Sequence, residues 1–100
     1  MTSPAEPTVA PGTGIDEEAL TRLIPPYNVI LHNDDHNSMD HVVKALLRSV
    51  PSLSPDDAIR IMFEAHENGS AVVISCPKET AEMYRDRLES FSLTATIELA

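Results

Sequence analysis

The sequence predicts an α+β domain in which three helices cover one face of a three-stranded antiparallel sheet, in the order βααβαβ. Three observations predict this fold class. Two serines in N-cap positions begin two helices in succession. Apolar runs that are typical of strands flank this pair, and the chain ends in a segment of regular apolar and polar alternation. The third helical pattern lies between the last two strands.

The chain divides into a flexible N-terminal extension, residues 1–25, and a folded domain, residues 26–100. Residues 1–14 hold three prolines and two glycines among small and polar residues. Such a segment cannot bury enough apolar surface to fold. Residues 15–24 favour a short helix that the following two prolines end, and we expect this helix to be ordered only against a partner.

The first strand is expected to begin at Tyr27, with alternate residues on opposite faces. This alternation places Leu31 and Asn33 on the same face. Ser38 is the expected N-cap of the first helix, which starts at Met39 and is ended by a proline. The apolar stripe of that helix comprises Met39, Val42, Val43, Leu46, Leu47 and Val50.

The second helix has clear signals at both ends. Ser54 is the expected N-cap, Pro55 is the first helical residue, and Asp57 completes a capping box. Asn68 and Gly69 supply a left-handed stop. The inner stripe is expected to comprise Ile59, Met62, Phe63 and His66.

The rest of the domain is predicted to be a strand, a helix and a strand. Residues 70–76 form a β-branched apolar run that is typical of a central strand, and Pro77 opens the third helix. The inner stripe of that helix is expected to comprise Ala81, Tyr84, Leu88 and Phe91. In the last strand, Leu93, Ala95, Ile97 and Leu99 are expected to face the core.

Composition excludes several classes of function. Seven basic and sixteen acidic residues give a net charge of -9, which argues against binding to nucleic acid. No segment approaches the roughly 20 apolar residues that span a membrane. The single cysteine cannot form an internal disulfide, and the N-terminus lacks the basic start and apolar stretch of a signal peptide. We therefore expect a cytoplasmic monomer that binds neither nucleic acid nor membrane.

Residues 31–39, LHNDDHNSM, crowd carboxylates, amides, imidazoles and a methionine into the end of the first strand. A metal site is one interpretation, but His32 and His36 lack the i, i+4 helical spacing of a zinc motif. A calcium loop counted from Asp34 has no glycine at its sixth position and has Ala45 at its twelfth. We expect no metal and no cofactor.

Acid/base catalysis is a second interpretation of this cluster. It needs a nucleophile or a positioned pair, and Ser38, Ser75 and Cys76 form no motif of a known enzyme class. We expect no enzymatic activity. A solvated turn whose acids cap the following helix is the simplest structural interpretation.

Two features instead favour a binding pocket. Asn33 shares a strand face with Leu31, and His66 lies at the core edge of the second helix. The two polar side chains would meet if that helix packs across the strand. They would then form an acceptor-rich rim beside an apolar hole.

Two longer stretches carry a resemblance to a known family. YNVILHNDDHNSMDHVV, residues 27–43, resembles the opening of ClpS proteins, the adaptors that bring N-end-rule substrates to an ATP-dependent Clp protease. IMFEAHENGSAVV, residues 61–73, is similar to the second helix and following strand of that family, with Met62 and His66 in the same spacing. The KETAE of residues 78–82 and the short apolar-acidic C-terminus also agree, so the resemblance covers residues 27–100.

The resemblance implies a substrate-binding site. The α-amino group of a substrate would be held by Asn33, Asp34, Asp35 and His66. Its first side chain would enter an apolar pocket formed by Leu31, Asn37, Met39, Val42, Met62, Ala65 and Leu93. Met39 would act as a gate that admits Leu, Phe, Tyr and Trp and rejects the β-branched Ile and Val.

The resemblance also implies a partner, the N-terminal domain of a Clp AAA+ unfoldase. Docking would involve Glu79, Glu82, Tyr84 and His36. Tyr84 stands where many relatives carry a lysine, Asn37 and Ser38 replace their Thr-Pro, and Ala65 replaces a larger aliphatic residue. The alternative function is a regulator that docks on the same unfoldase without recognising N-termini.

Overall fold

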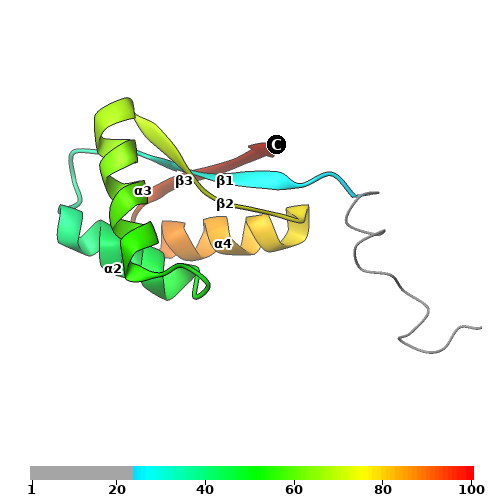
Figure 1. Cartoon of the computed structure of the whole chain (residues 1–100), viewed down its shortest axis with the longest axis horizontal. Helices are drawn as coiled ribbons and strands as arrows, with labels where there is room; N and C mark the ends of the chain where they lie inside the picture. The colour runs from blue at the N-terminus through cyan, green and yellow to red at the C-terminus, as the bar shows by residue number, and fades with distance from the viewer. Residues whose placement is uncertain (1–23) are drawn as a thin grey trace, which may run out of the picture.

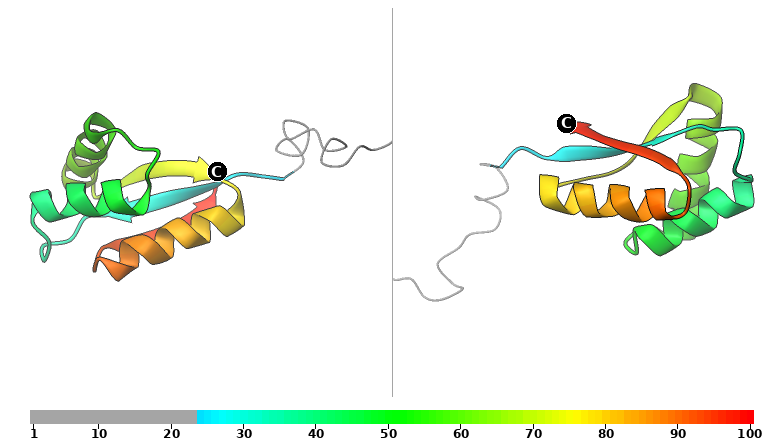
Figure 2. Two further views of the ribbon diagram at one scale, coloured as in Figure 1. Left: turned by 90° about the horizontal axis from the view of Figure 1, so that it is seen from below. Right: turned by 180° about the vertical axis from the view of Figure 1, so that it is seen from behind.

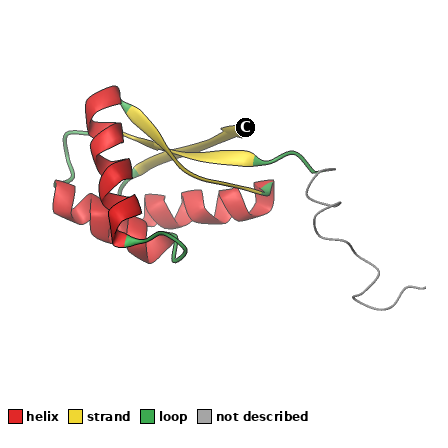
Figure 3. Cartoon of the chain, in the orientation of Figure 1, coloured by secondary structure: helices red, strands yellow, loops and turns green. Residues whose placement is uncertain are grey.

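The computed structural model describes residues 24–100, which form one sheet and three helices (Figure 1). The elements are β1 (Tyr27–His32), α2 (Met39–Ser49), α3 (Pro55–Asn68), β2 (Ser70–Cys76), α4 (Lys78–Ser90) and β3 (Thr94–Leu99). This order and the antiparallel pairing confirm the predicted fold class (Figure 3). The proposed N-terminal extension falls outside the described residues, apart from its last two positions. No helix within residues 24–100 is long and apolar enough to cross a membrane.

The central strand of the sheet is β1, because the strand order is β2-β1-β3. Leu31 pairs with Ala71 of β2 on one side and with Ala95 of β3 on the other. The prediction that residues 70–76 form a central strand is therefore wrong. The apolar run suggested a strand buried on both faces, but Val72 lies on the open face of this edge strand and is 43% exposed.

Local capping explains why the first two helices start where the sequence predicted. The Ser38 hydroxyl accepts a hydrogen bond from the His41 backbone N–H at 3.1 Å. Ser54 and Asp57 form a complete capping box, with both reciprocal bonds at 3.1 Å. Gly69 ends α3 in the left-handed region, with φ of 91°, which a residue without a Cβ adopts without strain.

The core lies between the sheet and the helix layer. Its buried members include Val29, Leu31, Ala45, Leu46, Val50, Ala58, Ile61, Ala65, Ala71, Val73, Ala81, Leu88, Leu93 and Ala95. Two hydrogen bonds hold α4 and the turn after it against α2. His41 Nε2 donates to the Phe91 carbonyl at 2.7 Å, and Arg87 donates to the Ser49 carbonyl at 3.2 Å.

The buried face of α3 differs from the predicted stripe. The helix buries Ala58, Ile61, Met62 and Ala65. Ile59 is 42% exposed and Phe63 is 46% exposed. Small alanines let the helix approach the core closely, so they occupy the inner face although the larger residues have the stronger apolar signal.

The last strand follows its predicted alternation only in part. Leu93 and Ala95 are buried and Ile97 is partly buried, but Leu99 is 59% exposed. Leu99 pairs with Tyr27, the first residue of β1, so it occupies the last rung of the sheet. Alternation sets the face of the sheet on which a side chain lies, and only the surrounding elements decide whether that face is covered.

Candidate functional site

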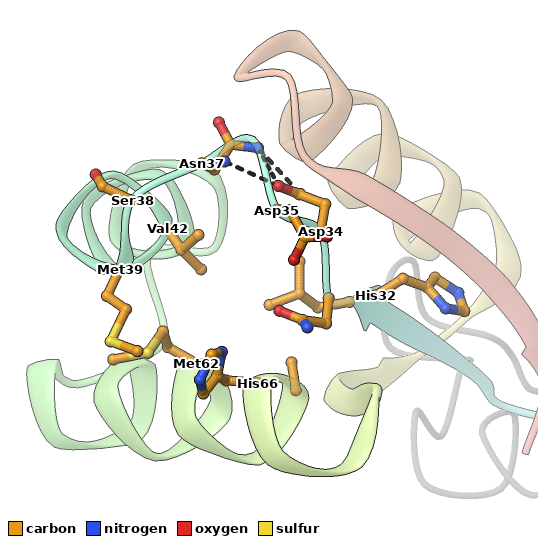
Figure 4. Close-up of a pocket in the computed structure, with 12 residues that line it drawn as sticks. His32, Asp34, Asp35, Asn37, Ser38, Met39, Val42, Met62 and His66 are labelled. Atoms are coloured by element: carbon orange, nitrogen blue, oxygen red, sulfur yellow. Dashed lines mark hydrogen bonds between the residues drawn. The ribbon is translucent and has the colours of Figure 1, made fainter.

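A pocket of about 320 Å³ opens beside the end of β1, between the loop that follows it, α2 and α3 (Figure 4). The residues that line it are Leu31, His32, Asn33, Asp34, Asp35, Asn37, Ser38, Met39, Val42, Met62, Ala65 and His66. They include every residue predicted for substrate binding except Leu93. The pocket thus brings together side chains that are up to 35 positions apart in the sequence, from Leu31 to His66.

Leu93 does not belong to the pocket lining. It is buried in the core immediately before β3, directly after the turn that follows α4. The prediction missed two residues that do line the pocket, Ser38 and His32. Ser38 is the N-cap of α2 and lines the pocket as well. The His32 imidazole turns toward β3, where its Nε2 lies 2.7 Å from Thr96 Oγ1, as its place on the other strand face implies (Figure 4).

One backbone contact brings Asn33 near His66. The Asn33 N–H donates to the Gly69 carbonyl at 2.9 Å, which joins the end of β1 to the end of α3. His66 lies on the last turn of α3, and Met62 lies one turn earlier on the same side. Asn33 and His66 thus line the same pocket, although α3 packs mainly against β2 and α2 rather than across β1.

Asp34 organises the loop between β1 and α2. Its Oδ1 accepts hydrogen bonds from the backbone N–H groups of His36 (2.8 Å) and Asn37 (2.9 Å). The Asn37 carboxamide donates to Oδ1 at 3.2 Å and to Oδ2 at 3.0 Å. Desolvation raises the pKa of Asp34, but these bonds and the nearby His36 together hold that pKa below its ordinary value. The carboxylate is therefore ionised at neutral pH.

Asp35 lies in a different environment from Asp34. It is exposed at the pocket rim and makes no hydrogen bond or ion pair with any residue in the part of the chain that the structure describes. His66 is likewise exposed on the facing helix. The two neighbouring acids are thus unequal, because one orders the loop and the other presents a negative charge to the pocket mouth.

The interior of the pocket is apolar. Leu31 and Ala65 are nearly fully buried, and Met62 is buried beside them. Met39 is 44% exposed, and in Figure 4 its side chain lies next to that of Met62 at the pocket mouth. Two flexible thioether side chains therefore form the wall opposite the acids, where they can adapt to a bulky guest.

Asn37 fastens the rim of the pocket to the rest of the fold. Besides its bonds to Asp34, its carboxamide donates to the Ser92 carbonyl at 2.9 Å. Ser92 has a φ of 67°, so the α4–β3 turn adopts a left-handed conformation at the residue whose carbonyl accepts this bond. Asn37 thereby restrains a loop that has no proline between β1 and α2.

Replacing Asn37 with Ala should lower the free energy of unfolding by about 1–2 kcal/mol, because it removes side-chain bonds to Asp34 and Ser92. Urea denaturation followed by circular dichroism measures this change. Asn68→Ala is the control, because Asn68 is exposed and its side chain makes no hydrogen bond within residues 24–100. Equal stability of both variants would show that the Asn37 bridge contributes nothing.

The residues predicted for partner docking do not form one surface. Glu79 and Glu82 lie one turn apart at the start of α4, and Tyr84 carries Arg87 over its ring at 5.8 Å. His36 belongs to the loop before α2. Figure 2 shows this loop and the start of α4 at opposite ends of the domain. A single small partner surface cannot include both.

Metal ligation finds no support in the described part of the chain. No group of three or more His, Cys, Asp or Glu side chains within residues 24–100 is arranged to hold an ion.

Comparison with known proteins identifies the family. The family described as ATP-dependent Clp protease adaptor protein ClpS matches residues 23–98. A ClpS adapter of Synechococcus elongatus is 48% identical over 77% of this chain and 81% of its own length. A chloroplastic ClpS adapter of Chlamydomonas reinhardtii is 44% identical over 91% of this chain and 55% of its own length.

A solved structure agrees with the sequence matches. Agrobacterium tumefaciens ClpS2, bound to L-phenylalaninamide, has a TM-score of 0.71 and 32% identity, and the match covers 76% of this chain and 98% of that one. Fold and sequence both point to the same family. The chain belongs to the ClpS family, and it is an adaptor of the ATP-dependent Clp protease rather than an enzyme.

Proposed function

We propose that this adaptor binds the free N-terminus of proteins whose first residue is bulky and hydrophobic, and delivers them to a Clp AAA+ unfoldase. The observation that carries the proposal is an acidic rim directly above an apolar pocket. The ligand in the Agrobacterium structure, L-phenylalaninamide, combines a free α-amino group with an aromatic side chain and supports the same pairing.

The polar rim suits an α-ammonium group. Such a group has three N–H donors and one positive charge. The rim offers it three acceptors, which are the side-chain carbonyl of Asn33, the carboxylate of Asp35 and the imidazole of His66. Each charge-assisted hydrogen bond contributes about 1.5–3 kcal/mol. Asp34 adds its negative charge while its loop bonds keep the neighbouring residues in place.

The apolar part suits one large side chain. A volume of about 320 Å³ is within the range of ligand pockets, and its lining favours Leu, Phe, Tyr or Trp. Burying such a side chain contributes about 1.5–3 kcal/mol. Together with the ammonium bonds and after the cost of association, this gives an affinity in the micromolar range, or about -8 kcal/mol. Met39 at the mouth would exclude a side chain that branches at Cβ.

Delivery requires a second surface. Glu79 and Glu82 at the start of α4 place two acids one turn apart, away from the pocket, and would bind a basic patch on the N-terminal domain of the unfoldase. The separation of His36 from these acids removes it from this surface.

We assign the chain to the cytoplasm as a monomer, although the Chlamydomonas relative is named as chloroplastic.

Asp35→Asn tests the proposal against the alternative of a regulator that ignores N-termini. We expect anisotropy to show at least about tenfold weaker binding of a labelled Leu-initiated peptide, because one charge-assisted bond is lost. Binding to the unfoldase N-terminal domain should not change. Asp40→Asn is the matched control, because Asp40 is exposed and pairs with Lys44 at 3.1 Å outside the pocket. Equal peptide affinity in both variants would favour the regulator.

A further inference from the structure

Two exposed apolar residues on α3 have no role in the pocket itself. Ile59 and Phe63 lie one helical turn apart, and each residue is more than two fifths exposed. With Met62 and His66 they are spaced by three and four residues, so the four form one continuous strip on the helix surface. Met62 and His66 line the pocket. The strip therefore continues the pocket wall out onto the surface.

The two ends of the pocket mouth differ in chemistry. In Figure 4, Met39 and Met62 lie together at one side, while His66 lies further along α3 and the two acids lie across from the methionines. Ile59 precedes Met62 in the helix, so it lies toward the Met39 side. One side of the mouth therefore carries the acids, and the other carries Met39 and Met62. Met39 and the exposed Ile59 and Phe63 of α3 are called the apolar shelf below.

This arrangement restricts the path of a bound peptide. The first residue has its ammonium at the acidic end and its side chain in the pocket. Its carbonyl must then leave in the remaining direction, over Met39 and the early turns of α3. The next Cα is only about 3.8 Å further on, so the second side chain lies close to the shelf.

We propose that the shelf of Met39, Ile59 and Phe63 is a subsite for an apolar second residue of the substrate. The inference rests on the proposed recognition of N-termini and extends it to position two. Exposed apolar patches of this kind mark binding surfaces.

The charges of α3 argue against an acidic occupant of the shelf. Arg60 pairs with Asp57 at 3.8 Å and with Glu64 at 3.6 Å. Arg60 lies only about 60° around the helix from Phe63. The acidic Asp56, three residues before Ile59, and Glu67, four residues after Phe63, lie on the same side of the helix as these two apolar residues. Asp56 and Glu67 form no ion pair within residues 24–100, so they would repel an acidic second residue beside the shelf but not an apolar one.

The test compares two peptides that begin Phe-Leu and Phe-Ser and are otherwise identical, with anisotropy as the measurement. The wild-type chain should bind the Phe-Leu peptide roughly fivefold more tightly, from partial burial of one leucine. Ile59→Ser and Phe63→Ser should each reduce this ratio toward one and leave the affinity for Phe-Ser unchanged. Val72→Ser is the control, because Val72 is similarly exposed but lies on β2, outside the pocket lining.

Three results would overturn the subsite. The wild-type chain could bind both peptides equally, or the ratio could survive both α3 substitutions. Sedimentation of the wild-type chain alone could also reveal a dimer that Phe63→Ser dissociates, which would make a second copy the occupant of the shelf. Failure of the proposed function is a separate outcome, because the wild-type chain would then bind neither peptide.

Discussion

Acetylation of the N-terminus is expected to weaken the binding of a Phe-initiated peptide by at least about a hundredfold. The acetyl group removes the positive charge and two of the three N–H donors. Asp35, which makes no other bond within residues 24–100, would then face a neutral amide with its charge unpaired. A site that pairs polar groups strongly penalises a ligand that leaves them unpaired.

The measurement is anisotropy with the free and acetylated forms of one labelled peptide. Repeating it with Asp35→Asn gives the matched comparison. Acetylation should cost less in this variant, because the charge that the ammonium balanced is already gone. If the free and acetylated peptides bind equally to the wild-type chain, the acidic rim has no role in recognition. If acetylation weakens binding to the Asp35→Asn variant by the same factor as binding to the wild-type chain, Asp34 and His66 recognise the ammonium charge instead.

Met39→Ala is expected to admit peptides that begin with Ile or Val. In the wild-type chain, overlap of a β-branched methyl with the Met39 side chain should cost about 2 kcal/mol, or roughly a thirtyfold preference for Leu over Ile. Met39 lies at the mouth against Met62, where the Cβ of the first residue would pass (Figure 4). Shortening it opens space at that point only.

The preference for Leu over Ile should fall to about threefold in the Met39→Ala variant. Met83→Ala is the control, because Met83 is similarly exposed but lies on α4, outside the pocket lining. A Leu preference that is the same in wild type, variant and control would show that Met39 does not gate the pocket.

The sequence alone predicted the features of this protein that depend on near neighbours. Ser38, the Ser54 and Asp57 box, and Gly69 define helix ends through bonds that span only a few residues. The fold class follows from such signals and from apolar periodicity. The family was recognised from residues 27–43 and 61–73, and with it nearly all of the residues that line the pocket.

Periodicity failed where burial depends on a distant surface. It assigned Ile59 and Phe63 to the core, yet α3 packs on its alanines and leaves both exposed. It made β2 a central strand, although strand order is a property of pairing across the whole sheet. Leu93 was assigned to the pocket but lies in the core.

Only the tertiary structure decided how the site is held together. The bond from Asn33 to Gly69 and the bridge from Asn37 to Ser92 join residues more than 30 positions apart. The same packing placed Asp34 where it bonds the loop backbone and left Asp35 exposed. It also separated His36 from Glu79. The physical reason is that local backbone preferences act over a few residues, whereas the position and partners of a side chain depend on how whole elements pack.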